Sequence, residues 1–258
     1  MAVIKKFRIK SFKEEESFIE LKKISMFYNK REILNNLSLK INKQEVLGML
    51  GPNGVGKSTI FHIITGLKDP SYGKVLINGN DCTNLPIYER ATKFKLGYVP
   101  QYGGFIQDLS LLENLNLVAE IHIQDKNLRK AKTEKIISQF EFDPLLKIKA
   151  KHLSGGQKKK LVISMALIND PNILLLDEPF AALDILTIKM LQEIIVNLQS
   201  LEKITVVVCD HQARDLLSCV DRAIVLSNGK IIASGSPDEI VNDSSARSAY
   251  FGEEFKIK

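Results

Sequence analysis

The chain has 258 residues, of which 45% are hydrophobic and 26% are charged, and it carries a formal net charge of +6. This composition is ordinary for a soluble globular protein and allows a sizeable core. The stretches without charge are far shorter than the ~20 apolar residues of a membrane-spanning helix. The start of the chain also lacks the continuous apolar segment of a secretory signal. We therefore expect a cytoplasmic chain that does not cross a membrane.

The cysteines and the basic charge indicate no chemistry by themselves. Cys82, Cys209 and Cys219 are odd in number and follow no pattern, which favours reduced thiols over a disulfide framework or a metal site. Much of the positive charge lies within residues 5–13 and 158–160. Such an excess suits nucleic acid, an anionic membrane surface, nucleotide phosphates or solvated faces, so the charge does not decide between them.

Strand and helix patterns alternate along the chain after a loosely attached, flexible extension, residues 1–16. Residues 18–41 and 73–82 predict antiparallel strands, which would make the sheet mixed on its N-terminal side. Four runs rich in branched apolar residues predict strands covered on both faces: EVLGML, NILLLD, ITVVVCD and RAIVLS. This order predicts an α/β fold with a mixed, largely parallel sheet.

Helical patterns interrupt this order within the single domain expected for residues 17–258. Between about residues 103 and 165 the strand signal disappears, which predicts a helical subdomain inserted into the α/β core. Further along the chain, one helix has an apolar face that we expect to pack on the core, formed by Ile188, Leu191, Ile195 and Leu198. A C-terminal tail, residues 246–258, ends the domain.

The segment GPNGVGKST fits the pattern Gly-x-x-x-x-Gly-Lys-Ser between a predicted strand and a predicted helix, as a phosphate-binding P-loop requires. Glycines let backbone N–H groups surround phosphate oxygens, and the helix N-terminus adds its positive dipole end. Lys57 can reach the β- and γ-phosphates, and the Ser58 hydroxyl can bind Mg²⁺. The predicted nucleotide contacts of this segment are Gly51, Pro52, Asn53, Gly54, Val55, Gly56, Lys57, Ser58 and Thr59.

The run NILLLDEPF provides the second half of a phosphoryl-transfer site. Asp177 lies at the end of the predicted strand, where it can hold Mg²⁺ through water, and Glu178 can orient an attacking water. Guanine-specific P-loop proteins share an Asn-Lys-x-Asp motif after the P-loop, and its absence argues against a GTPase. No acceptor pocket or lid is evident for a kinase. We therefore predict hydrolysis of ATP with Mg²⁺.

The small polar turn LSGGQ, residues 153–157, precedes this carboxylate pair and opens a further predicted helix. Ser154, Gly155 and Gly156 can present a hydroxyl, bare N–H groups and a helix dipole to a γ-phosphate. A single ATP has no need of two phosphate cradles. Together with the P-loop and the carboxylate pair, the turn resembles the signature motif of the ATP-binding cassette (ABC) family, and the likeness extends from about residue 18 to the end of the chain.

This resemblance implies a RecA-like P-loop NTPase core with an N-terminal antiparallel β subdomain. It implies a homodimer in which two cassettes face head to tail, so that the turn contacts the ATP of the partner chain through Ser154, Gly155, Gly156 and Gln157. It also implies transmembrane permease subunits as partners, a peripheral position on the cytoplasmic face of the inner membrane, and no nucleic acid.

Further residues match family positions one by one. Tyr28 matches an aromatic that stacks on adenine, and Asp184 matches the loop that crosses the dimer interface. Gln101 matches the glutamine that touches Mg²⁺ and the attacking water, and His211 matches the switch histidine that contacts the γ-phosphate. The implied catalytic residues are thus Glu178, His211 and Gln101, and the implied metal ligands are Ser58, Gln101 and Asp177.

Four positions depart from the family pattern. Met165 stands where an arginine is common, and Cys209 stands where a threonine is usual; both changes affect local packing without removing a phosphate or metal contact. Gln107 and Asp108 stand where basic residues are expected, near the groove for the membrane partner. Hydrolysis is still expected.

The finer resemblance is to the ATPases of lipopolysaccharide export systems in Gram-negative bacteria, carried by LPIYERATKFKLGYVPQ, LDEPFAALD, DHQARDLL and ARSAYFGEEFKIK. ATPases of branched-chain amino-acid uptake share much of the sequence before the tail, so the tail is expected to discriminate, and they remain an alternative. A nucleic-acid-associated or ribosome-associated cassette is a second alternative. The tail aromatics would pack either on the chain's own helices or across the dimer partner.

Overall fold

The computed structural model describes residues 17–252 and residue 255. The predicted N-terminal extension, residues 1–16, lies outside the described residues, as do residues 253–254 and 256–258 of the predicted tail. Within the described ranges, every helix is too short or too polar to span a lipid bilayer.

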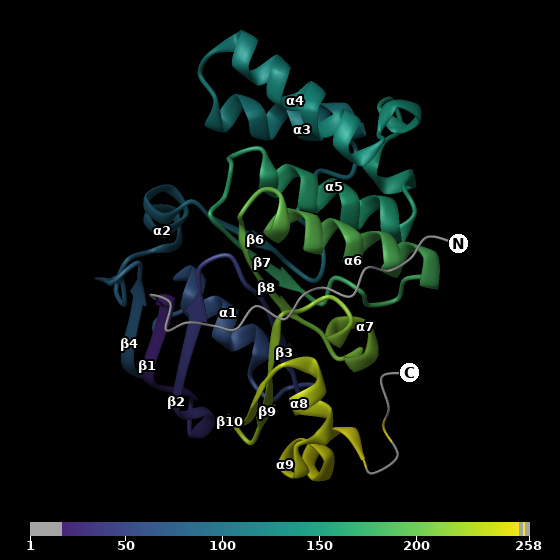
Figure 1. The fold of residues 1–258 in the computed structure, drawn as a ribbon. Helices are drawn as coiled ribbons and strands as arrows, with labels where there is room; N and C mark the ends of the chain where they lie inside the picture. Colours follow the sequence, from purple (N-terminus) through teal and green to yellow (C-terminus); the bar gives the residue numbers. More distant parts are fainter. Residues whose placement is uncertain (1–16, 253–254, 256–258) are drawn as a thin grey trace.

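The N-terminal strands form a sheet of their own (Figure 1). Four antiparallel strands lie in the order β2-β1-β4-β5: β1 (Ser17–Tyr28), β2 (Arg31–Asn42), β4 (Tyr72–Ile77) and β5 (Asn80–Asp81). The two edges of β1 pair with β2 and β4, so β1 cannot also extend the parallel sheet. The expected N-terminal antiparallel β subdomain is thus confirmed. The strand pattern alone had placed these strands at one side of a single mixed sheet, and that placement is wrong because they form a separate sheet.

The second sheet has six strands in the order β10-β9-β3-β8-β7-β6: β10 (Lys230–Gly235), β9 (Arg222–Ser227), β3 (Val46–Leu50), β8 (Thr205–Cys209), β7 (Ile173–Asp177) and β6 (Leu96–Val99). Neighbours from β9 to β6 are parallel, and β10 is antiparallel to β9. The four runs rich in branched residues are all strands of this sheet. The sheet is mixed because its edge strand β10, from the C-terminal part of the chain, is antiparallel to the others.

The parallel strands are buried on both faces. Along β7, Ile173 and Leu175 join the core shared with β1, β2 and α1 (Lys57–Thr65), whereas Leu174 and Leu176 join the core shared with the later helices. Successive side chains of a strand point to opposite faces, so a continuous apolar run fits a strand between two layers. The six-stranded sheet therefore separates two hydrophobic cores.

Helices line the second core and extend beyond it. The segment between β6 and β7 is helical, with α3 and α4 lying beyond α5 at one end of the molecule (Figure 1). The helices of that segment are α3 (Leu111–His122), α4 (Lys126–Phe140), η1 (Asp143–Leu145), η2 (Ala150–His152) and α5 (Gly155–Leu167). The other helices are α2 (Ile87–Phe94), α6 (Ile185–Ser200), α7 (Ala213–Leu217), α8 (Pro237–Asn242), α9 (Ser244–Ala246) and η3 (Arg247–Phe251). The buried residues of α6 are the four predicted: Ile188, Leu191, Ile195 and Leu198.

The described part of the tail packs on the chain's own core. Tyr250, Phe251 and Phe255 contact the second hydrophobic core. Phe251 and Phe255 stack with ring centroids 4.5 Å apart, and the Arg214 guanidinium of α7 lies 5.6 Å from the Phe255 centroid. The Tyr250 hydroxyl donates a 2.8 Å hydrogen bond to the carbonyl oxygen of His211. These contacts correspond to the first of the two expected arrangements, in which the tail aromatics pack on the chain's own helices.

Candidate functional site

The loop between β3 and α1, which the sequence predicts to bind phosphate, has backbone conformations that favour glycine. Gly51, Gly54 and Gly56 have φ values of 150°, 77° and 111°, and two of them also lie against other backbone and side chains. A Cβ would lie 2.7 Å from the Leu226 carbonyl oxygen at Gly51, and 2.7 Å from Leu34 Cδ2 at Gly56. Only glycine fits these two positions, and both belong to the predicted motif.

Lys57 begins α1 and turns its side chain back along the loop. It is buried, and its ammonium donates hydrogen bonds to the carbonyl oxygens of Gly51 at 2.7 Å and Pro52 at 3.2 Å. The next residue, Ser58, has its hydroxyl 3.4 Å from Oδ1 of Asp177 at the end of β7. The fold thus brings the loop and the carboxylate pair together, as the sequence predicts.

Three side chains converge beyond Asp177. The Gln101 amide, from the loop after β6, donates a 2.6 Å hydrogen bond to Oε2 of Glu178. Nδ1 of His211, from the loop after β8, lies 3.4 Å from the same oxygen. Glu178 itself has a φ of 44°, a left-handed backbone that costs an L-residue about 1–2 kcal/mol. Such strain is typical of positions at which the direction of a side chain matters.

Asp177 has two further neighbours that the sequence pattern did not identify as site residues. The Tyr98 hydroxyl donates to Oδ2 at 3.3 Å, and the Cys209 thiol donates to Oδ1 at 2.7 Å. Burial, together with the nearby Asp177 carboxylate, raises the pKa of both Tyr98 and Cys209. Both groups therefore keep their protons and act as donors to the carboxylate. A signal existed for each, since Tyr98 lies in GYVPQ and Cys209 departs from the family pattern.

The remaining departures have local roles. Met165 packs against the second hydrophobic core, where an arginine is common in the family. Asp108 forms an ion pair with Lys151 at 2.7 Å, and the Gln107 carbonyl oxygen accepts a hydrogen bond from the backbone N–H of Lys151 at 3.0 Å. These contacts fix the loop before α3.

The predicted signature turn forms the N-terminus of α5. Ser154 is the N-cap, and it makes a capping box with Gln157. Gly156 packs against the start of α6, where a Cβ would lie 2.5 Å from Cγ2 of Thr187. Asp184 caps α6 by accepting a hydrogen bond from the Thr187 N–H at 3.0 Å. The polar contacts of the turn are thus local, and Ser154 is exposed.

The other predicted nucleotide contacts lie at exposed or partly exposed positions. Tyr28 ends β1 with 39% of its surface exposed. In the loop, Asn53 is exposed, and the Val55 N–H donates to the Pro52 carbonyl oxygen at 3.3 Å. Thr59 lies in the first turn of α1. These positions leave Tyr28 and the loop open to a bound molecule.

The residues present fit a magnesium ion shared with phosphate oxygens. Ser58, Asp177 and Gln101 offer hydroxyl, carboxylate and amide oxygens, which are the ligand types Mg²⁺ prefers. In the part of the chain that the structure describes, no group of three His, Cys, Asp or Glu side chains is arranged to hold a metal ion.

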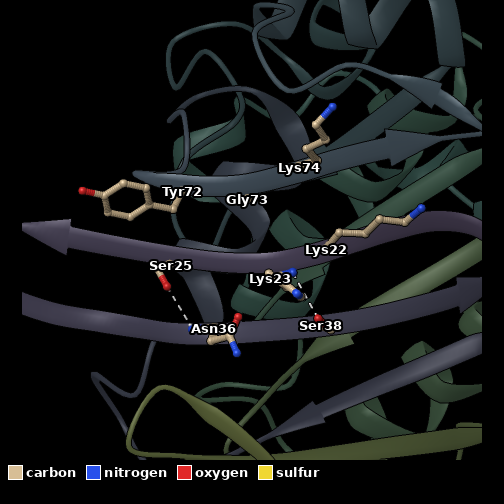
Figure 2. Close-up of a pocket in the computed structure, with 8 residues that line it drawn as sticks. All are labelled: Lys22, Lys23, Ser25, Asn36, Ser38, Tyr72, Gly73 and Lys74. Carbon is tan, nitrogen blue, oxygen red and sulfur yellow. Dashed lines mark hydrogen bonds between the residues drawn. The ribbon is translucent and has the colours of Figure 1, made fainter.

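A separate hollow of about 650 Å³ lies on the outer face of the antiparallel sheet (Figure 2). Lys23 and Asn36 have φ values of 52° and 48°, at irregularities in the strand pairing. Their backbone N–H groups are satisfied by the hydroxyls of Ser38 at 3.0 Å and Ser25 at 2.9 Å. We interpret the hollow as a product of these bulges, since both serine hydroxyls in it bond the irregular backbone.

The sequence matches two family models. Residues 34–181 match the model described as ABC transporter, and residues 230–256 match the model described as branched-chain amino acid ATP-binding cassette transporter. Among curated proteins, the lipopolysaccharide export system ATP-binding protein LptB of Haemophilus influenzae is 35% identical over 245 residues, which cover 93% of this chain and 100% of that protein. LptB of Escherichia coli K12 is 32% identical over 237 residues, covering 92% of this chain and 98% of that protein. An uncharacterized ABC transporter ATP-binding protein of Rhizobium meliloti is 36% identical over 230 residues, covering 89% of this chain and 84% of that protein.

Solved structures share the fold. The ATP-binding cassette MJ1267 of an ABC transporter superposes with a TM-score of 0.82 at 27% identity, over 92% of this chain and 99% of that one. A dimeric structure of the cassette MJ0796 bound to ADP and Pi has a TM-score of 0.75 at 29% identity, over 85% of this chain and 98% of that one.

Proposed function

The chain belongs to the ABC transporter family and is an ATP-binding ATPase of that family, and on this premise we propose that it powers lipopolysaccharide export from the inner membrane of a Gram-negative bacterium. The observation that carries this proposal is the likeness to LptB of Haemophilus influenzae, which extends over the full length of that protein. In this proposal the chain acts as a homodimer on the cytoplasmic face, docked on transmembrane permease subunits.

The proposed chemistry assigns a role to each side chain of the cluster. The loop N–H groups and Lys57 bind the β- and γ-phosphates, and Tyr28 stacks on adenine. Glu178 orients and polarises the attacking water, while His211 contacts the γ-phosphate. Mg²⁺, held by Ser58, Asp177 and Gln101, would neutralise charge on the phosphate oxygens.

The second half of each proposed site comes from the partner chain. Ser154, Gly155, Gly156 and Gln157 contact the γ-phosphate bound by the partner's loop, and Asp184 faces the interface. This arrangement is supported by the exposed position of Ser154 at a helix N-terminus, where a hydroxyl and free N–H groups suit an anion.

Cross-linking tests the composite site. Cysteines placed at Asn53 and Gln157 should be joined between chains by a short bis-maleimide when ATP is present in a Glu178→Gln background. The native cysteines are all buried and should not compete. The same pair in a Lys57→Ala background is the control and should not be joined. Links formed only within one chain would contradict the sandwich.

Branched-chain amino-acid uptake is a second candidate function, because the end of the chain matches that family model. The tail therefore does not separate the two transporter groups, although it was expected to. Purifying the tagged chain from its native membranes and measuring ATP-dependent release of lipopolysaccharide, against uptake of leucine, separates them. Leucine uptake without lipopolysaccharide release would overturn the export proposal.

The lysine-lined hollow on the antiparallel sheet gives little support to a nucleic-acid-associated role. The hollow of Figure 2 is lined by Lys22, Lys23 and Lys74, but Lys22 pairs with Glu20 at 2.9 Å and Lys74 pairs with Asp81 at 3.2 Å. Such pairing reduces the local positive potential that phosphate backbones require. Salt-sensitive binding of RNA or DNA would favour this alternative.

A further inference from the structure

The loop after β6, residues 100–106, is attached to the helical segment through its backbone. Ile106 exchanges two hydrogen bonds with Asn114 of α3: its N–H donates to Oδ1 at 2.8 Å, and the Asn114 amide donates to its carbonyl oxygen at 3.0 Å. Gly104 packs on Val162 of α5, where a Cβ would lie 2.8 Å from Cγ1. From this loop, the Gln101 side chain reaches the α/β core at Glu178.

Lys159 of α5 holds the same loop at the base of the Gln101 side chain. Its ammonium donates to the carbonyl oxygen of Gln101 at 2.9 Å and to that of Pro100 at 3.5 Å. Burial lowers the pKa of Lys159, while the carboxylates of Asp177, Asp210 and Glu178 act in the opposite direction. A lysine of the basic run 158–160 is therefore directed into the protein, toward the carboxylate cluster.

Its neighbour in the run is placed differently. The ammonium of Lys160 lies 5.6 Å from the ring centroid of Phe142, within the helical segment. Lys160 thus provides a matched comparison: it has the same chemistry and the adjacent sequence position, but its ammonium does not lie at the Gln101 loop.

Helix α5 connects the signature turn to this contact. Ser154 caps the helix, and Lys159 lies in the second turn of its 13 residues. We propose that Lys159 is a positioning residue that ties the helix bearing the signature turn to the loop bearing Gln101, so that binding of the partner chain's ATP at Ser154 changes the position of Gln101 at Glu178 in the same chain. This inference rests on the proposed function, which places the partner's ATP at the turn.

The contact predicts coupling between the two nucleotide sites of a dimer. A displacement of α5 on contact with the partner's ATP moves the Gln101 carbonyl through Lys159, and the Gln101 amide moves with it relative to the core. Each site then hydrolyses ATP efficiently only when the opposite nucleotide is also bound. ATP binding by a separate chain depends mainly on the loop before α1 and on Lys57, which Lys159 does not contact.

Steady-state hydrolysis tests the inference with three single variants. We expect Lys159→Met to lower kcat about tenfold, because it removes both hydrogen bonds from the ammonium to the Gln101 loop, and to reduce the Hill coefficient for ATP toward one. Lys159→Arg should restore most of kcat, and Lys160→Met should behave as the unmodified protein. ATP affinity of the separate chain, measured with a fluorescent ATP analogue, should be unchanged. If Lys159→Met fails to fold, Lys159→Gln should show the same kinetic loss.

A double variant shows whether Lys159 acts through Gln101. Lys159→Met should cause no further loss of kcat in a Gln101→Ala background, because residues that act as one unit are not additive. Additive losses, or equal losses for Lys159→Met and Lys160→Met, would overturn the inference while the proposed function stands. Absence of ATP hydrolysis by the unmodified chain with Mg²⁺ would instead overturn the proposed chemistry and the inference with it.

Discussion

The Gln101 side-chain amide and the Glu178 carboxylate share a 2.6 Å hydrogen bond that joins the loops after β6 and β7. The water-orienting role proposed for Glu178 requires a carboxylate that can accept a proton at this point. Glu178→Gln keeps the shape but removes this basicity, so hydrolysis should fall about a hundredfold or more. Phosphate release measures this fall in hydrolysis. ATP should still bind and hold two chains together, and size-exclusion chromatography measures the resulting dimer.

A matched control for that variant is Glu193→Gln, which changes an exposed carboxylate on α6. Its hydrolysis rate should equal that of the unmodified protein. A normal rate in Glu178→Gln would refute the assigned role.

Lys57 should dominate binding of the phosphates. Replacing it by alanine removes a charge-assisted contact, and we expect ATP affinity to fall by about ten- to a hundredfold. Isothermal titration with ATP and Mg²⁺ measures this. Lys68→Ala, an exposed lysine just beyond α1, is the control and should bind normally. Equal affinities for the two variants would contradict the P-loop assignment.

Arg90 should contribute to stability rather than to chemistry. It is fully buried, and its guanidinium donates to four backbone carbonyl oxygens, those of Ile63, Ile64, Thr83 and Leu85. Two of these belong to the last turn of α1, where a positive charge also offsets the helix dipole. Arg90→Met removes the donors that these carbonyls share and should lower the free energy of unfolding by about 3 kcal/mol.

Urea unfolding measures this loss. Arg90→Lys keeps the charge but not the planar set of donors. Its free energy of unfolding should therefore lie between those of Arg90→Met and the unmodified protein. A variant Arg90→Met as stable as the unmodified protein would show that water replaces the guanidinium.

The tail should stabilise the chain that carries it. Tyr250 bonds the His211 carbonyl oxygen at 2.8 Å, and its pKa is raised to about 12 by burial and by Asp210. Tyr250→Phe should lower the free energy of unfolding by about 1 kcal/mol at neutral pH. Because the folded pKa is raised, this advantage of the tyrosine is complete below its usual pKa of about 10 and is lost as the pH rises through about 12.

Thermal unfolding of a chain lacking residues 250–258 separates the two arrangements considered for the tail. Packing within one chain predicts a lower unfolding midpoint for the truncated monomer. An unchanged midpoint with weaker ATP-dependent dimerisation would show instead that the tail acts on the partner.

Local chemistry predicted the parts of the site that depend on short segments. Gly51 and Gly56 are required by their backbone conformation, and Ser154 caps its helix through Gln157, three positions away. Both motifs can therefore be recognised from a short segment of sequence. The pairing of β1 with β4 was not visible in the same way. Alternation predicts strands but not their partners, because pairing depends on sheet edges far apart in the chain.

The contacts around Asp177 show the same limit. Tyr98 and Cys209 reach it from β6 and β8. Lys159 reaches the Gln101 loop from α5, a predicted helix in which the sequence showed this lysine only as part of a basic run. Each contact joins elements whose proximity is set by strand order. A pattern of residues that are adjacent in the sequence does not specify the order of strands in the sheet.

The six-stranded sheet that separates the two cores also determines which backbone amides are best protected from hydrogen exchange. Strands β7 and β8 are buried along their whole length and flanked by strands on both sides, so their amide protons have no local route to water. Their hydrogen–deuterium exchange should require global unfolding, whereas β5, a two-residue strand at a sheet edge, should exchange through small fluctuations. Asp177 and Cys209 end these two strands, so the carboxylates near the P-loop should be anchored to a slowly exchanging part of the molecule.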